Sequence, residues 1–96
     1  MRRKRFDATP CHVFNHAVGE ANLFEDDPDR LRFVRYVRRA LQTTRVTLLA
    51  WVLMKTHYHL LVVGSSAQVS RLMKMIQLRY AVYFNRRYGK RGHCFE

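Results

Sequence analysis

One long apolar run, from Val46 to Val63, most constrains the fold, because a polar segment at residues 55–59 breaks it in the middle. A membrane-spanning helix needs about 20 consecutive apolar residues, so the interruption argues against one. Lys55-Thr56 is short enough for a tight connection. The run therefore predicts two strands, 47–54 and 57–63, that pair antiparallel. We expect the first of them to be buried on both faces.

The second predicted strand carries two histidines, His57 and His59, separated by Tyr58. Side chains of a strand alternate between its faces, so the two imidazoles point the same way, roughly 6.6–7 Å apart along the strand. Tyr58 and Leu60 then pack on the opposite face. Two such imidazoles can lean toward one metal ion or one phosphate. Taken alone, the pair is better explained as two ordinary polar positions where a strand enters a sheet.

The remaining segments predict one more strand and two helices. Residues 11–17 have the pattern of a strand, with Val13 and Phe14 on opposite faces. An Asp cap followed by Pro28 starts a helix that runs to about Thr43. Ser65-Ser66 and Gly89 bound a second helix. The order is a split β-α-β-β-α, which indicates an α+β, ferredoxin-like or RRM-like sandwich with an antiparallel sheet.

The apolar spacing within the two helices predicts which side of each faces the sheet. For the first helix the expected buried stripe comprises Leu31, Val34, Val37 and Leu41, widened by Phe33 and Tyr36. For the second it comprises Val69, Leu72, Met73, Ile76, Tyr80, Tyr83 and Phe84.

The net charge of the 96-residue chain is +11, from 18 Lys and Arg against 7 Asp and Glu. Such an excess favours a polyanionic partner, nucleic acid first and an acidic membrane surface second. A solvated basic face is the alternative explanation for many of these residues. The candidate phosphate contacts are Arg2, Arg3, Lys4, Arg5, Arg71, Lys74, Arg86, Arg87, Lys90 and Arg91.

The cysteines and the N-terminal segment indicate a cytoplasmic protein. Cys11 and Cys94 are far apart and form no Cys-x-x-Cys pair, as expected of free thiols. The basic residues 1–5 are not followed by the apolar segment of a signal peptide.

Four segments together resemble one protein family in the correct order. They are Cys11–Val18 with Leu23–Asp27, Leu49–Leu61 with its central His-Tyr-His, Ser70–Met73 with Tyr83–Arg87, and Gly92–Glu96. The family is that of the HUH single-tyrosine transposases (IS200-like), in the branch associated with repetitive extragenic palindromes. The resemblance covers nearly the whole chain.

This resemblance implies metal-dependent cleavage and rejoining of single-stranded DNA, often beside a hairpin. It assigns His57 and His59 as ligands of a divalent ion, Mg²⁺ or Mn²⁺, that polarises the scissile phosphate. A tyrosine on a later helix attacks that phosphate in the family and forms a covalent link. It also implies a bacterial, nucleoid-associated protein and a possible homodimer.

The sequence departs from the family pattern at three places. Lys55-Thr56 replaces the usual Pro-Asn, and His16 and Glu20 stand where many relatives have arginine. Nothing in the chain matches the helix with the nucleophilic tyrosine or the third metal ligand. We therefore expect residues 1–96 to be a single IS200-like domain without that helix, which binds DNA but cleaves it little.

The other titratable side chains have simpler explanations than catalysis. We expect Tyr36, Tyr58, Tyr80 and Tyr83 to pack in the core, Tyr88 to be exposed, and His12, His16 and His93 to be plain surface or sheet residues. Glu96 reaches a metal only if the tail folds back. One alternative function is a non-catalytic nucleic-acid-binding module; another is a structural metal site completed by a partner, although two histidines leave a metal half-coordinated.

Overall fold

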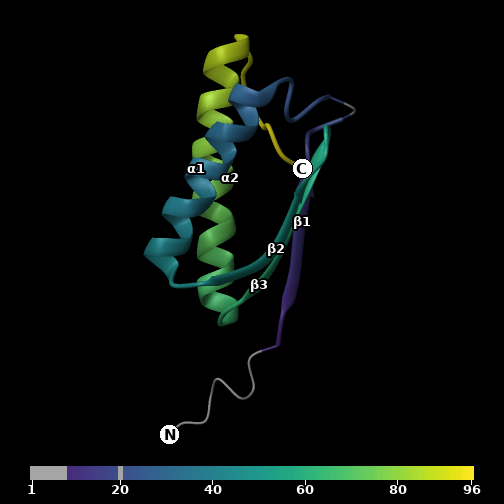
Figure 1. Cartoon of the computed structure of the whole chain (residues 1–96). Helices are drawn as coiled ribbons and strands as arrows, with labels where there is room; N and C mark the ends of the chain where they lie inside the picture. Colours follow the sequence, from purple (N-terminus) through teal and green to yellow (C-terminus); the bar gives the residue numbers. More distant parts are fainter. Residues whose placement is uncertain (1–8, 20) are drawn as a thin grey trace, which may run out of the picture.

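Two helices cover one face of a three-stranded antiparallel sheet in the computed structural model, which describes residues 9–19 and 21–96 (Figure 1). The elements are β1 (Cys11–His16), α1 (Asp27–Thr44), β2 (Thr47–Leu53), β3 (His57–Val63) and α2 (Ser66–Tyr88). The strand order is β1-β3-β2, so β3 is central. The predicted α+β class and the antiparallel pairing of β2 with β3 are confirmed.

Alternation along β3 separates a core side from an open side. Tyr58, Leu60 and Val62 are at most 1% exposed and point toward the helices. His57 and His59 lie on the other face and are partly exposed. The predicted orientation of the two histidines is confirmed.

Both helices begin and end at residues whose chemistry favours a helix terminus. The side chain of Asp26 accepts a hydrogen bond from the Asp29 amide and caps α1. Ser65 and Gln68 form a capping box at the start of α2. Gly89 ends α2 with a φ of 64°, in the left-handed region that glycine adopts without strain. These signals explain why both helices lie close to their predicted bounds.

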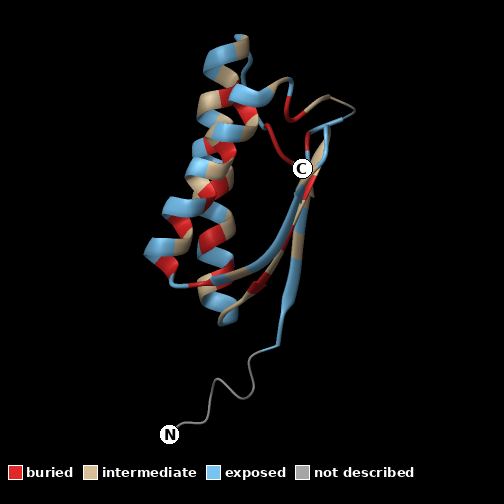
Figure 2. Ribbon diagram, viewed as in Figure 1, coloured by how far each residue is buried: buried red, intermediate tan, exposed pale blue. Residues whose placement is uncertain are grey.

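Aromatic residues fill the core between the helices and the sheet, where buried residues gather (Figure 2). Phe33 of α1 is fully buried and its ring contacts those of Phe24, Tyr58 and Tyr80. Leu31, by contrast, is 69% exposed, so its prediction as a buried residue is wrong. The buried stripe of α1 instead includes Phe33, Val37 and Ala40, and the ring of Phe33 contacts Tyr58 of β3.

The prediction that β2 is buried on both faces is also wrong. Leu49, Trp51 and Val52 are each at least 50% exposed. Val52 pairs with His59 and lies on the open face, which neither helix covers (Figure 1), whereas Trp51 pairs with Leu60 on the helix side. Trp51 is exposed there because β2 lies at the edge of the described sheet, where β3 is its neighbour on one side. A register shift between Leu48 and Ala50 further loosens the pairing there.

The last residues of the chain return to the sheet, where no element was expected. Phe95 pairs with Ala17 in an antiparallel bridge just beyond β1. The Glu96 amide donates to the His16 carbonyl at 3.0 Å, and the Gly19 amide donates to the Glu96 carboxylate at 3.2 Å. The C-terminal segment therefore lies beside the end of β1 that carries His16.

Two predicted properties agree with the described part of the chain. Within it, neither α1 nor α2 combines the length and apolarity of a membrane-crossing helix. Cys11 is exposed, Cys94 is buried, and both are free thiols.

Candidate metal and DNA site

The two histidines of β3 line an open hollow on the uncovered face of the sheet. Their ring centroids are 5.0 Å apart and their planes are nearly perpendicular, at 85°. The hollow has a volume of about 580 Å³ and is lined by Phe14, His16, Ala17, Gly19, Thr56, His57 and His59.

Hydrogen bonds hold both imidazoles through the same ring nitrogen. Nδ1 of His59 lies 2.8 Å from Nε2 of His12, and Nδ1 of His57 lies 3.1 Å from the hydroxyl of Thr56. Among the described contacts, Nε2 of each ring thus remains for a ligand. Desolvation, with repulsion from His12 and His57, lowers the pKa of His59. The neutral imidazole, which is the form that binds metals, is therefore favoured.

Antiparallel pairing brings four of the five histidines to this face. His16 pairs with His57 across β1 and β3, and His12 lies on the same face as His59. His12 was expected to be a plain sheet residue, yet it contacts the predicted ligand His59 directly. No group of three His, Cys, Asp or Glu side chains among residues 9–19 and 21–96 could hold a metal ion. These residues therefore offer an ion two imidazoles and no complete ligand set.

Phe14 is a residue of this site that the sequence did not reveal as functional. It pairs directly with His59, and its side chain is on the open face, where the residue is 57% exposed. Its ring stacks with those of His12 and His59 at centroid distances of 5.3 and 5.7 Å. The alternation of His12, Val13 and Phe14 is readable in the sequence, but the register that places Phe14 beside His59 is not.

The sequence of residues 8–95 matches the family model described as IS200-like transposase. The chain belongs to the IS200-like transposase family. The fold agrees: a structure from Deinococcus radiodurans R1 that is assigned as a transposase superposes with a TM-score of 0.70 at 15% identity. The match covers 90% of this chain and 69% of that one. No curated protein matches the chain.

The five tyrosines of this transposase domain lie on the helix side of the sheet, away from the histidines. Tyr58 is on the buried face of β3, and the other four belong to α1 and α2. Each hydroxyl has a partner there: Arg32 for Tyr36, Gln77 for Tyr58, the Leu23 carbonyl for Tyr80, and Asp29 for Tyr83 and Tyr88. Desolvation raises the pKa of Tyr58 to about 12. None of these hydroxyls lines the hollow with His57 and His59.

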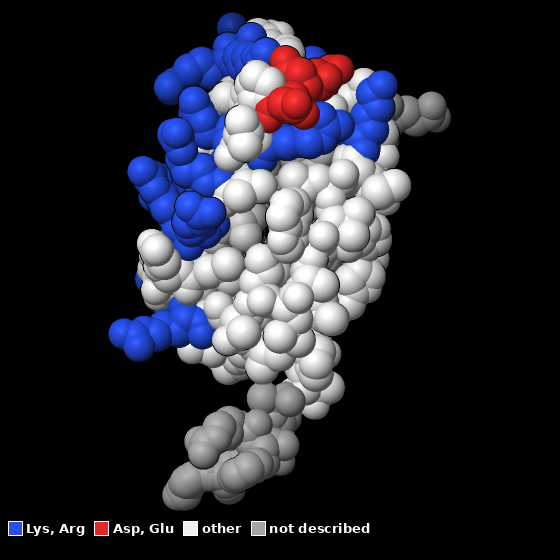
Figure 3. Space-filling model, in the orientation of Figure 1, with Lys and Arg blue, Asp and Glu red and all other residues white. Residues whose placement is uncertain are grey.

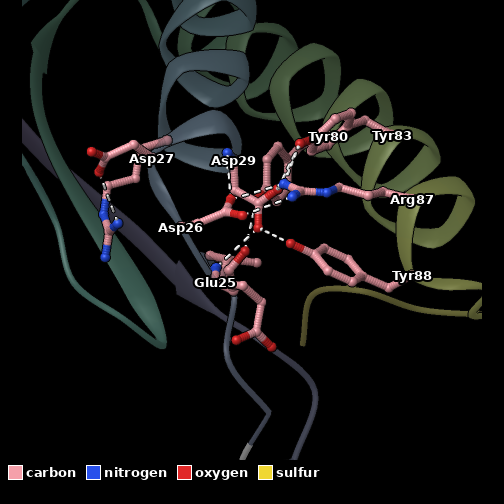
Figure 4. A network of polar contacts seen from close by, with 10 residues as sticks. Glu25, Asp26, Asp27, Asp29, Tyr80, Tyr83, Arg87 and Tyr88 are labelled. Carbon is pink, nitrogen blue, oxygen red and sulfur yellow. Dashed lines mark hydrogen bonds and ion pairs between the residues drawn. The ribbon is translucent and has the colours of Figure 1, made fainter.

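Tyr88, which was expected to be exposed, takes part in a polar network that joins the two helices of the transposase domain (Figure 4). Asp29 of α1 is fully buried, and its carboxylate accepts hydrogen bonds of 2.6 Å from both Tyr83 and Tyr88. Arg87 donates to Asp29 at 2.6 Å and to Asp26 at 2.7 Å. Burial raises the pKa of Asp29, but the hydrogen bonds from these tyrosines and from Arg87 outweigh it and hold the pKa below its usual value.

This network predicts that acid weakens the fold. The pKa of Asp29 is lower in the folded than in the unfolded chain, so its contribution to stability is present above about pH 4 and is lost as the pH falls through the folded value. Urea unfolding at several pH values between 6 and 3 should show a falling midpoint. Asp29→Asn should flatten the acid end of this profile, and two parallel profiles would contradict the assignment.

Many of the basic residues that the structure describes lie on the helices or just after α2. In Figure 3, most Lys and Arg lie over the helices and at the upper end, and a further group lies at the upper right; the lower part of the sheet side that this view shows is largely free of them. Five of the candidate phosphate contacts are exposed, namely Arg71, Lys74, Arg86, Lys90 and Arg91. Arg87, in contrast, forms ion pairs with Asp26 and Asp29. Arg2, Arg3, Lys4 and Arg5 lie outside the described residues.

Proposed function

We propose that this transposase domain binds single-stranded or hairpin DNA and places a phosphate at His57 and His59 through a divalent ion. The observation that carries the proposal is the pair of neighbouring imidazoles on the open sheet face, in a chain of net charge +11 that belongs to a transposase family. The exposed basic residues on and just after α2 supply sequence-independent phosphate contacts.

The donor set fits an ion whose coordination the substrate completes. Mg²⁺ commonly takes only one or two protein ligands, usually carboxylates, together with substrate phosphates and water. Imidazole ligands suit the softer Mn²⁺ better than Mg²⁺. His57 and His59 would hold the ion through Nε2, since Nδ1 of each is engaged by Thr56 or His12. When bound, the ion supplies positive charge next to the phosphoryl oxygens. The domain should therefore bind DNA more tightly when the ion is present, and bind the ion more tightly when DNA is present.

Strand cleavage by the described residues is not part of this proposal. A tyrosine attacking a phosphate at His57 and His59 would have to reach the open face, and all five tyrosines lie on the helix side with their hydroxyls bonded. We therefore propose a domain that binds and positions DNA. Because no tyrosine lies on the open face, a non-catalytic, metal-independent nucleic-acid-binding module is the second candidate function.

The deciding experiment compares the wild type with His57→Ala/His59→Ala on a 5′-labelled hairpin with a single-stranded tail. We expect Mn²⁺ to tighten binding by the wild type, and the double variant to lose this gain while it keeps the salt-sensitive binding seen in EDTA. His93→Ala is the matched control, because His93 is exposed and does not line the hollow of His57 and His59.

Two results would contradict parts of the proposal. Equal affinities of the wild type and the double variant, with and without Mn²⁺, would favour the metal-independent module. A covalent protein–DNA band on a denaturing gel would show that one of the five tyrosines attacks DNA, against their arrangement in the fold.

A further inference from the structure

The exposed ring of Phe14 lies nearly parallel to the rings of His12 and His59 on the open sheet face. The planes of His12 and His59 differ by 15°, and each differs from the plane of Phe14 by 28°. Their centroids are 5.0–5.7 Å apart. At 57%, Phe14 is more exposed than any other phenylalanine, tyrosine or tryptophan among residues 9–19 and 21–96.

The surroundings of Phe14 favour a flat and weakly polar occupant. The residues that share its face on β1 and β3 are His12, His16, His57, His59, Leu61 and Val63, so no lysine, arginine or carboxylate lies among them. A nucleobase is flat, stacks on aromatic rings, and is attached to a phosphate chain that the net charge of +11 attracts.

We propose that Phe14 stacks on a base of the single strand, beside the phosphate placed at His57 and His59. The inference rests on the proposed function and adds a determinant of specificity to it. Bases in a duplex are already stacked and paired, whereas those of a single strand are free to stack on a side chain. Phe14 therefore makes the open sheet face selective for single strands.

The first measurement is the affinity of Phe14 variants for a labelled single strand and for the matching duplex. We expect Phe14→Ala to weaken single-strand binding about five- to 150-fold, the range that corresponds to one stacked base, and to leave duplex binding unchanged. Phe14→Trp should retain binding, because it keeps a flat aromatic ring. Phe14→Leu also removes the ring but keeps apolar bulk. It therefore tests the loss of stacking even if the alanine variant does not fold.

Trp51 provides a matched control and a reporter. It is the only tryptophan, is 52% exposed, and lies on the helix side of the edge strand, so Trp51→Leu should leave DNA binding unchanged. In the double variant Trp51→Phe/Phe14→Trp, the sole tryptophan stands at position 14. Its fluorescence should be quenched by the single strand and not by the duplex.

The outcomes separate this inference from the function on which it rests. If the wild type shows Mn²⁺-dependent binding that Phe14→Ala and Phe14→Leu leave unchanged, the stacking role is wrong and the proposed function stands. If the wild type binds no single strand, both are wrong. If Phe14→Ala instead turns a dimer into a monomer in sedimentation, the ring belongs to a protein interface and the stacking role is overturned.

Discussion

Replacing Asp29 by alanine is expected to lower the free energy of unfolding by about 3–5 kcal/mol. Asp29 is fully buried and accepts hydrogen bonds from Tyr83, Tyr88 and Arg87, which all belong to α2. Alanine would leave two hydroxyls and a guanidinium without their common acceptor at the junction of the two helices. Urea unfolding followed by circular dichroism measures the loss.

Asp27 provides the control for this substitution. It lies in the same first turn of α1, but its side chain is 90% exposed and forms an ion pair with the neighbouring Arg30, at 3.4 Å. Asp27→Ala should leave the unfolding midpoint nearly unchanged, because exposed ion pairs contribute little. If the two variants unfolded at the same urea concentration, the network would not stabilise the fold as we infer.

Phe33→Ala is expected to cost about 3–5 kcal/mol of unfolding free energy, the range for deleting a buried aromatic side chain. Phe33 is fully buried, and its ring contacts Phe24, Tyr58 and Tyr80, so its removal leaves a cavity that touches three other rings. Thermal or urea unfolding would show the loss directly.

Leu31→Ala tests which side of α1 faces the core. Leu31 is two residues from Phe33 but 69% exposed, so its truncation should change the unfolding free energy by less than about 0.5 kcal/mol. A cost for Leu31→Ala equal to that of Phe33→Ala would place the buried stripe of the helix where the sequence pattern predicted it.

Local chemistry made the elements and their ends predictable. Asp26 and Ser65 cap the helices as their side chains suggest, and the alternation around Tyr58 places His57 and His59 together because successive residues of any strand face opposite ways. These features depend only on near neighbours in the chain. The family resemblance added the choice of His57 and His59 over other polar pairs.

Features that depend on distant neighbours were predicted less well. The exposure of Trp51 follows from the position of β2 at the sheet edge, which its apolar composition does not encode. The contact of His12 with His59 requires the register between β1 and β3. Likewise, the bond from Tyr88 to Asp29 joins residues 59 positions apart. Each of these needed a pairing that only the folded chain defines.

The alternation along β3 has a consequence for how such a domain can change over evolutionary time. Tyr58, Leu60 and Val62 belong to the core cluster, while His57 and His59 lie on the other face of the strand and are not members of it. Mutations of the three core residues persist only if the chain still folds. Mutations of the two histidines instead change what the open face can bind. A descendant could therefore exchange its histidines for other side chains, and acquire a new ligand, without rebuilding the strand that carries them.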